Sequence, residues 1–464
     1  MSAGNERGEG TAEIQVADHR RADARDEHGR NRASARRPAT DLDGREPGYI
    51  CFAGQDWWYH NQAHSDFQLM REVAADRDVL VVNSIGVRLP KPGSASQPHR
   101  RVIRKIRAVA KLLRRPIDDL PRFWVFSPLV LPFYGSRVAR TVNAWLVRRQ
   151  VKWAAKRAGI RDAIFFVTIP TACDVIEPMP RRALVVNRSD KYSEFEGADR
   201  DYIRGCEERL LRSADAVVYT SHALMAEEQH LAGERGHFLD HGVDLDRFAP
   251  RAVDAVEPDD VRDLPHPRIG FYGALDALVV DAALLESVAR QLPDAHLVLV
   301  GSADLDLQPL VELPNVHWLG AKPYAEIADY GRAFDVALMP WLDSEWIRCC
   351  NPIKLKEYLA LGLPIVSTPF PELERYRDIV TIASDATFVD AVRDALSRPR
   401  PNASDADSQR RRAAVLEDSW SARAGDLVAL AEGGSAAGDQ RPATALTPSS
   451  SLGRNKSGRV THTA

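Results

Sequence analysis

Cysteines are few in this chain, and their arrangement excludes several kinds of site. The five cysteines form no Cys-x-x-Cys pair, so no zinc knuckle is indicated, and their odd number gives no disulfide framework. A reducing compartment is the simplest environment for such a chain.

Long apolar runs and a strong net charge are also missing. The start of the chain contains no apolar segment like that of a secretory signal peptide, and no stretch approaches the roughly 18 apolar residues that a membrane-spanning helix needs. The formal net charge of -3 argues against a chain built as a whole to bind nucleic acid. We therefore expect a cytoplasmic protein with no nucleic-acid partner, whose membrane contact is peripheral and on the inner face of the plasma membrane.

The overall composition is that of a globular protein, but the two ends of the chain contain few large apolar residues. The 464 residues predict two or three domains at roughly 100–200 residues each. Hydrophobic residues make up 44% and charged residues 27%, which is ordinary for a soluble globular protein. Residues 1–45 and 433–464 contain too few large apolar side chains to offset the entropy of ordering, so we expect two disordered tails.

Between these tails, short apolar runs alternate with helical patterns. Continuous Val, Ile and Leu runs are typical of strands buried on both faces, and their alternation with helices predicts parallel, doubly wound sheets. The predicted strands are Tyr49–Ala53, Val79–Val82, Ile164–Val167, Leu184–Val186 and Ala216–Thr220, followed by Ile269–Tyr272, Leu297–Val300, Val316–Leu319, Val336–Met339 and Ile365–Ser367.

This pattern breaks at residues 249–267, where Pro and acidic residues predict a linker. The chain is therefore expected to form two α/β domains, residues 46–250 and 262–405, with a cleft between them. Ligands of open α/β sheets bind at the carboxyl ends of the strands, so the cleft is the expected active site.

The segment 336–370 is the most informative part of the sequence. Asn is a preferred N-cap and Pro is favoured at the first helical position, so a helix is expected to begin at Asn351-Pro352 and to end at Gly362. The start of this helix would point free N–H groups toward the cleft, which suits a phosphate.

Two charged side chains on this helix fit the rest of a nucleotide. Lys354 in the first turn would add a positive charge near the phosphates, and the carboxylate of Glu357, one turn after Ile353, could accept hydrogen bonds from a ribose. The alternative is an amphipathic core helix with Lys354, Lys356 and Glu357 on a solvated face, which these residues alone allow at least as well.

Several segments, taken in order, resemble GT-B glycosyltransferases of group 1 (family 4-like) over roughly residues 48–432. The segment NPIKLKEYLALGLPIVST resembles their donor-binding helix, with the pattern E-x-x-A-x-G-x-P starting at Glu357. HGVDLDRF resembles the hinge, RIGFYGALDALVVD the first strand and glycine turn of the donor domain, and LVLVGSAD and NVHWLGAKPYAEIADY later strands and the nucleobase-facing turn. GQDWWYHNQAHSDFQLM and IGFYGALD look closest to exopolysaccharide and teichuronic-acid type enzymes.

This resemblance implies two Rossmann-like domains facing a cleft, with a C-terminal helix at about 409–432 packing back on the first domain. It implies that the second domain binds a UDP- or GDP-sugar without a metal or other cofactor. The implied donor-side residues are Gly273, Ala274, Gly301, Gly320, Asn351, Ile353, Lys354 and Glu357.

Two departures from the family pattern concern the donor site. The first Glu of the family motif falls at Cys349, so a carboxylate that contacts the donor sugar in retaining members is missing. The glycine turn also lacks nearby basic residues, and Lys354 or Arg348 is expected to supply charge for the diphosphate.

The acceptor is expected on the first domain. Asp56 and His60 follow the first strand, and either could act as general base, although His60 and His64 could equally be structural. Asp190 follows another strand, where an ordinary polar loop is an equal alternative, and His241 opens the hinge segment. No third ligand accompanies the histidine pair. Asp-Leu-Asp occurs at residues 41–43, 244–246 and 304–306, with one copy in a tail and another inside the hinge segment, so no metal is assigned.

Residues Arg100–Arg115 predict a basic amphipathic helix. Its apolar stripe and its Arg and Lys residues suit an anionic membrane interface, and the alternative is a helix packed on its own domain.

The sequence thus predicts transfer of a sugar from a nucleotide sugar to a lipid-linked or polysaccharide acceptor in cell-surface glycan synthesis. Two alternatives stay open. One is a nucleotide-sugar epimerase or phosphorylase on the same scaffold. The other is a non-catalytic member of a membrane-associated polysaccharide assembly, which Cys349 keeps in view.

Overall fold

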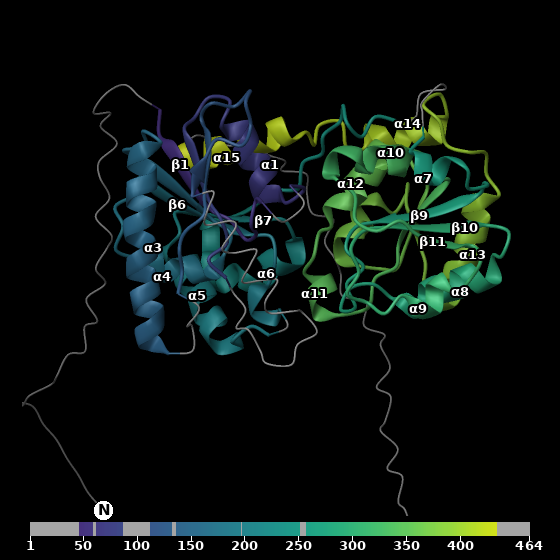
Figure 1. The fold of residues 1–464 in the computed structure, drawn as a ribbon, viewed down its shortest axis with the longest axis horizontal. Coiled ribbons are helices and arrows are strands. Elements are labelled where there is room, and N and C mark those ends of the chain that lie inside the picture. The colour runs from purple at the N-terminus through teal and green to yellow at the C-terminus, as the bar shows by residue number, and fades with distance from the viewer. Residues whose placement is uncertain are drawn as a thin grey trace, which may run out of the picture. The chain divides into compact units, whose positions relative to one another are not determined.

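The computed structural model describes residues 46–58, 62–86, 112–131, 136–195, 197–250 and 257–433, all of which belong to the compact unit Arg37–Ala464. Two separate β-sheets organise these residues (Figure 1). We call the part built on the first sheet the N-terminal lobe and the part built on the second sheet the C-terminal lobe.

The sheet of the N-terminal lobe has the order β3-β4-β2-β1-β5-β6-β7-β8 and is parallel except for β3. Its strands are β1 (Gly48–Phe52), β2 (Val79–Val82), β3 (Leu113–Arg114), β4 (Phe123–Phe126), β5 (Ala163–Val167), β6 (Ala183–Arg188), β7 (Ala216–Tyr219) and β8 (Gly236–Phe238). Its helices are α1 (Ser65–Val73), α3 (Arg137–Arg157), α4 (Cys173–Ile176), α5 (Arg200–Ser213) and α6 (His222–Ala232).

Both faces of this sheet are buried, as continuous apolar strands require. Successive residues of β1 point to opposite faces: Ile50 and Phe52 join the core under α3, α4 and α5, whereas Tyr49 and Cys51 join the core under α1. The second core is completed by α15 (Trp420–Glu432) from the far end of the chain, which supplies Trp420.

The sheet of the C-terminal lobe is fully parallel and has the order β11-β10-β9-β12-β13-β14. Its strands are β9 (Arg268–Tyr272), β10 (His296–Val300), β11 (Val316–Trp318), β12 (Val336–Met339), β13 (Ile365–Ser367) and β14 (Thr381–Ile382). The helices are α7 (Asp259–Arg262), α8 (Ala282–Gln291), α9 (Gln308–Val311), α10 (Ile327–Arg332), α11 (Glu345–Arg348), α12 (Ile353–Ala360), α13 (Asp385–Leu396) and α14 (Ala406–Ala413).

The predicted α/β class with two doubly wound, Rossmann-like domains is confirmed. All ten predicted strands are present, and four further short strands, β3, β4, β8 and β14, extend the sheets. The winding of the second sheet reverses between β9 and β12, which is the position where open α/β sheets bind their ligands.

Three predicted segments differ from the structure. The predicted linker 249–267 contains α7, whose Val261 is fully buried. The predicted helix at about 409–432 is two helices, because α14 packs against α12 in the C-terminal lobe and only α15 packs on α1. The predicted basic helix Arg100–Arg115 lies outside the described residues up to Lys111, and its end is wrong, since Leu113–Arg114 pairs with β4 as a strand. In the described ranges, no helix is both long enough and apolar enough to cross a bilayer.

Candidate functional site

A cavity of about 1090 Å³ takes its walls from both lobes. It lies at the carboxyl ends of the strands, since it includes Gly273 after β9, Gly301 after β10 and Asp190 after β6. Cavities of about 300–1,000 Å³ hold a drug-sized ligand, so this one has room for a nucleotide sugar.

The cavity brings together nine of the residues that the sequence predicted for the site. These are Gly273, Ala274, Gly301, Asn351, Ile353, Lys354 and Glu357 on the donor side, and Asp190 and His241 on the acceptor side. Residues far apart in the sequence are therefore brought to one cavity, as the predicted layout requires.

Glu357 is a buried carboxylate at the cavity wall. Its side chain accepts a hydrogen bond from the Tyr324 hydroxyl at 2.9 Å, and only 4% of the residue is exposed. Burial raises the pKa of Glu357 to about 7, against the opposing effect of the Tyr324 hydrogen bond. The solvated helix face that the sequence allowed as an alternative is therefore wrong, since Lys356 is also buried.

Lys354 reaches over the glycine turn after β9. A methyl group placed on Gly273 would lie 2.5 Å from the Lys354 ammonium, so the turn must be glycine for the cation to sit there. The ammonium also lies 4.6 Å from the ring centre of Trp341. Burial lowers the pKa of Lys354 to about 8, so the cation is poorly hydrated and is available to an anionic ligand.

Asn351 is not the N-cap of the donor helix, which corrects the prediction. The helix α12 begins at Ile353, and Pro352 occupies the N-cap position without a side-chain cap. The Asn351 amide instead donates to the backbone oxygen of Thr220 at 2.8 Å and to Asp240 at 2.9 Å. Its side chain is therefore used to join the two lobes, although the residue still borders the cavity.

Asp190 and His241 line the cavity from the N-terminal lobe. Asp190 accepts a hydrogen bond from the Trp346 indole at 3.2 Å, and burial raises its pKa to about 6. His241 is 5% exposed, and its Nδ1 has no hydrogen-bond partner among the described residues. Burial lowers the pKa of His241 to about 4, so a neutral imidazole can bond a ligand hydroxyl.

Three other predicted residues lie elsewhere, and a fourth falls outside the described residues. Asp56 is not among the residues that line the cavity, and its carboxylate accepts from the backbone N–H of Trp58 at 3.0 Å. Gly320 stands behind the wall, where its carbonyl accepts from the N–H of Gly301. Arg348 pairs with Asp343 outside the cavity, and His60 lies outside the described residues.

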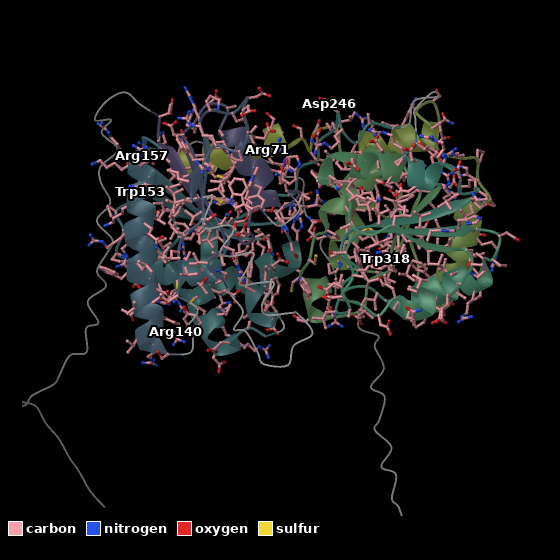
Figure 2. All side chains as sticks on the ribbon, in the orientation of Figure 1. Arg71, Arg140, Trp153, Arg157, Asp246 and Trp318 are labelled. Atoms are coloured by element: carbon pink, nitrogen blue, oxygen red, sulfur yellow. The ribbon has the colours of Figure 1, made fainter. Side chains whose placement is uncertain are left out.

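Several wall residues were missed by sequence reasoning. Arg71 on α1 (Figure 2) and His64 come from the N-terminal lobe. Arg247 belongs to the hinge-like segment, and its guanidinium lies 5.0 Å from the ring centre of Tyr324. Strand ends point to the cavity and the hinge segment was represented by His241, but nothing in the sequence indicates that α1 and Arg247 also turn side chains into it.

The position of the missing family Glu is turned away from the cavity. The Cys349 sulfur lies 3.9 Å from a carboxylate oxygen of Glu227 on α6, and burial raises its pKa to about 11. The neighbouring residue Cys350 lines the cavity instead.

Two groups of described side chains place three possible metal ligands within 4.8 Å of one another. They are Cys173, Asp174 and Cys206, and Glu227, Glu345 and Cys349. Neither group lines the cavity, and each already contains a cation, namely Arg209 in the first and Lys191 in the second.

Part of this chain matches known glycosyltransferases in sequence. Residues 266–398 match the family model of glycosyl transferases group 1. TuaH, a teichuronic acid biosynthesis glycosyltransferase of Bacillus subtilis (strain 168), is 30% identical over 204 residues, which cover 42% of this chain and 49% of that protein. The match thus spans about half of that relative's length.

Solved structures share the fold over most of the chain. Sucrose-phosphate synthase from Thermosynechococcus elongatus has a TM-score of 0.62 at 17% identity, covering 84% of this chain and 99% of that chain. Anabaena Alr3699/HepE in complex with UDP-glucose has a TM-score of 0.57 at 14% identity, covering 83% and 99%. The chain therefore has the GT-B fold, and its residues 266–398 match the family model of glycosyl transferases group 1.

Proposed function

We propose that this protein transfers a sugar from a nucleotide-sugar donor, held by the C-terminal lobe, to a glycan or lipid-linked acceptor at the N-terminal lobe. The observation that carries the proposal is the shared cavity, which places Glu357 and Lys354 of α12 opposite Asp190 and His241. Domain-spanning sites of this kind exclude water from two substrates at once.

The donor side offers complementary chemistry for a nucleoside diphosphate. The Lys354 ammonium stands over the glycine turn, where a diphosphate could approach the backbone closely. Glu357 lies one turn further along α12 and offers carboxylate oxygens to a ribose diol. A departing nucleoside diphosphate develops negative charge, which Lys354 and Arg247 could stabilise without a metal ion.

UDP and UDP-sugars are the first donors to try. The Anabaena neighbours were solved with UDP, with UDP and glucose, and with UDP-glucose. The relative TuaH is named for teichuronic acid biosynthesis, which supports a cell-surface acceptor for this chain. The membrane contact predicted for Arg100–Arg115 falls largely outside the described residues and stays a prediction.

Replacing Glu357 with Ala tests the donor site. Hydrogen bonds to a charged group contribute about 1.5–3 kcal/mol each, so Glu357→Ala should weaken UDP or UDP-glucose binding by at least about tenfold in calorimetry. Glu286→Ala is the matched control, because Glu286 is on α8 and pairs only with Arg290 at the surface. Equal UDP affinity in all three proteins would sink the assignment.

Product analysis separates the proposal from its two alternatives. Transfer requires an acceptor, so labelled sugar should appear on a glycan or lipid extract only when acceptor is present. A product formed from donor alone would favour epimerisation. Donor binding without transfer or hydrolysis would favour a non-catalytic member of an assembly.

A further inference from the structure

Exposed apolar side chains are concentrated on one part of the N-terminal lobe. Of the eleven large apolar side chains exposed in the described part of the chain, seven lie between residues 112 and 153. They are Leu112, Leu129, Leu131, Val138, Val142, Trp145 and Trp153. Scattered exposed apolar residues are ordinary, but a cluster of this kind marks an interaction surface.

The helix α3 arranges four of these residues as a stripe. Val138, Val142, Trp145 and Trp153 are spaced at helical intervals, so they share the face of α3 opposite to its buried residues, such as Val147 and Val151. Trp145 is 52% exposed and Trp153 is 45% exposed. A Trp ring exposed to this extent is usually covered by another part of the protein or by a partner. Trp153 is labelled on α3 in Figure 2.

The same face is strongly cationic. The sequence of α3, RVARTVNAWLVRRQVKWAAKR, contains seven Arg and Lys residues and no Asp or Glu. Arg149, Lys152 and Lys156 fall within the stripe and are exposed. The Arg149 guanidinium lies 5.3 Å from the ring centre of Trp145, which combines a cation with an aromatic ring at the surface.

A leucine-bearing loop is fixed beside α3 by paired amide hydrogen bonds. The backbone N–H of Leu129 donates to Gln150 at 2.9 Å, and that of Leu131 donates to Asn143 at 2.8 Å. The amide groups of Gln150 and Asn143 donate back to the carbonyls of Leu129 and Leu131. The two exposed leucines are therefore held in place along one side of α3.

We propose that this surface, the outer face of α3 with Leu129 and Leu131, docks on a bilayer containing anionic phospholipid. Trp rings are enriched at membrane–water interfaces, and each Lys or Arg near an anionic surface strengthens binding. The absence of acidic residues from α3 removes the repulsion that would oppose this contact. The inference stands without the proposed transfer reaction and without the segment Arg100–Lys111.

Charge neutralisation on α3 is the first test. With vesicles of phosphatidylglycerol and phosphatidylcholine in equal amounts, the full chain should co-sediment, and added salt should release it. Two cations at about 1 kcal/mol each predict that Arg149→Gln with Lys152→Gln weakens binding by about thirtyfold. Vesicles of phosphatidylcholine alone should bind weakly in every case.

Matched controls separate this surface from charge and aromatic content in general. Arg398→Gln with Arg410→Gln makes the same charge change on exposed residues of the C-terminal lobe and should leave vesicle binding unchanged. Trp145→Ala with Trp153→Ala should weaken binding by about tenfold or more, whereas Trp318→Ala, at a Trp 45% exposed on β11, should not.

Three results would overturn the inference. One is full vesicle binding by both α3 variants. Another is loss of binding only when Arg104, Lys105 and Arg107 are neutralised, which would assign the contact to that segment. The last is a dimer that dissociates in the α3 variants while the parent chain binds no vesicles. UDP binding measured in the same variants keeps this result separate from a failure of the donor site.

Discussion

Burial brings the pKa values of two facing side chains close to neutrality. The pKa of Glu357 rises to about 7 and that of Lys354 falls to about 8, in both cases chiefly because the charged form loses hydration. The two groups lie within one turn of α12 at the wall of the cavity. Both are charged together only over a narrow pH range, so small changes in pH should alter ligand binding.

Nucleotide binding should therefore have a maximum near the range between these two pKa values. Below about pH 7, Glu357 is protonated and loses acceptor strength for a ribose diol. Above about pH 8, Lys354 loses its charge in the free protein. A diphosphate that binds there must restore this charge, which weakens binding. UDP calorimetry across this range should show both limbs, and Glu357→Gln should abolish the acid limb while keeping the alkaline one. A flat profile in the parent protein would contradict this account.

Asp190 should affect transfer rather than donor binding. Its carboxylate lies in the N-terminal part of the cavity wall, and its raised pKa of about 6 predicts that activity rises as pH increases through that value. Asp190→Asn should lower the turnover number by roughly 100-fold, at the low end for loss of an acid–base group, with UDP affinity unchanged. The acid limb near pH 6 should disappear in the variant. Glu194→Gln is the control, because Glu194 lies nearby in the chain and pairs with the exposed Arg200, and a shared loss would indicate damage to this segment.

Single residues show where sequence reasoning stops. Glu357 and Lys354 both border the cavity, as their spacing along one helix predicts, and their contacts with a donor stay predictions. Asn351 was placed correctly at the cavity but given the wrong contact, because its partners Thr220 and Asp240 lie in the other lobe. Local preference for an N-cap could not compete with a buried amide that satisfies two distant oxygens.

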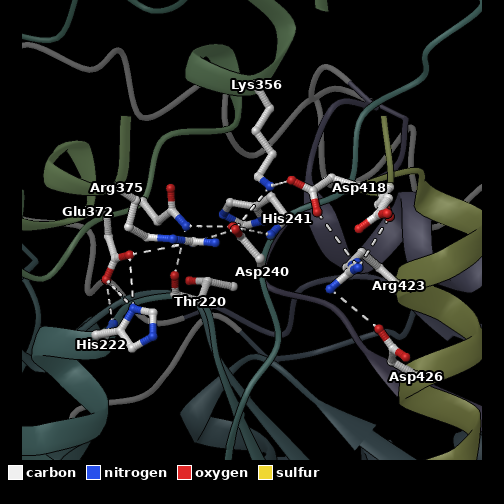
Figure 3. Close-up of polar contacts among 12 residues, drawn as sticks. Thr220, His222, Asp240, His241, Lys356, Glu372, Arg375, Asp418, Arg423 and Asp426 are labelled. Atoms are coloured by element: carbon white, nitrogen blue, oxygen red, sulfur yellow. Dashed lines mark hydrogen bonds and ion pairs between the residues drawn. The ribbon is translucent and has the colours of Figure 1, made fainter. Parts of the chain in front are cut away.

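The helix α12 is also fixed by a buried cluster of charges (Figure 3). The Lys356 ammonium is 2.9 Å from Asp240 and also pairs with Asp418, while Arg375 pairs with Asp240 at 2.6 Å. Asp240 follows β8 in the N-terminal lobe and Asp418 immediately precedes the start of α15. The helix α12 is thus bonded both to the opposite lobe and to the segment that leads into α15.

Removing the central cation of this cluster should be strongly destabilising. Breaking a buried ion pair by removing one partner typically costs about 3–5 kcal/mol, so Lys356→Met should lower the free energy of unfolding by that order. The loss should be smaller at low pH, where the uncompensated carboxylates can be protonated. Arg393→Met on the exposed face of α13 is the control. If denaturant titrations give similar unfolding midpoints for the two variants, the buried charge cluster does not stabilise the fold as proposed.

Elements with long apolar runs were predicted well, and short or marginal ones were not. In the helix α8 (Ala282–Gln291), the Asp281 side-chain cap and the apolar spacing agree, so local sequence and observed structure are consistent. In contrast, β14 is only two residues long, and the strand β3 replaced the end of a predicted basic helix. Such segments are decided by a neighbouring strand, which the sequence pattern does not display.

The two lobes share the last part of the chain that the structure describes. After α14 packs on α12, the backbone of Val243 donates to the carbonyl of Asp418, and α15 then covers the α1 face of the first sheet. Glu432 at the end of α15 bonds the hydroxyl of Tyr49 and the guanidinium of Arg77, both at 3.2 Å. The N-terminal lobe is therefore incomplete until the end of the chain has been made.

Truncation tests this dependence of one lobe on the far end of the chain. Ending the chain after Asp418 removes Trp420 and Leu427 from a buried core, at about 1.5–3 kcal/mol for each large side chain. The expected result is early melting of the N-terminal lobe with UDP still bound by the C-terminal lobe, because the predicted donor contacts Lys354 and Glu357 remain. Ending the chain after Gly433 keeps α15 and should leave the melting temperature unchanged. If both truncated chains melt at the same temperature as the full chain, α15 does not complete the core. Loss of a helix that completes the core would expose the apolar side chains that it covers and lower the melting temperature.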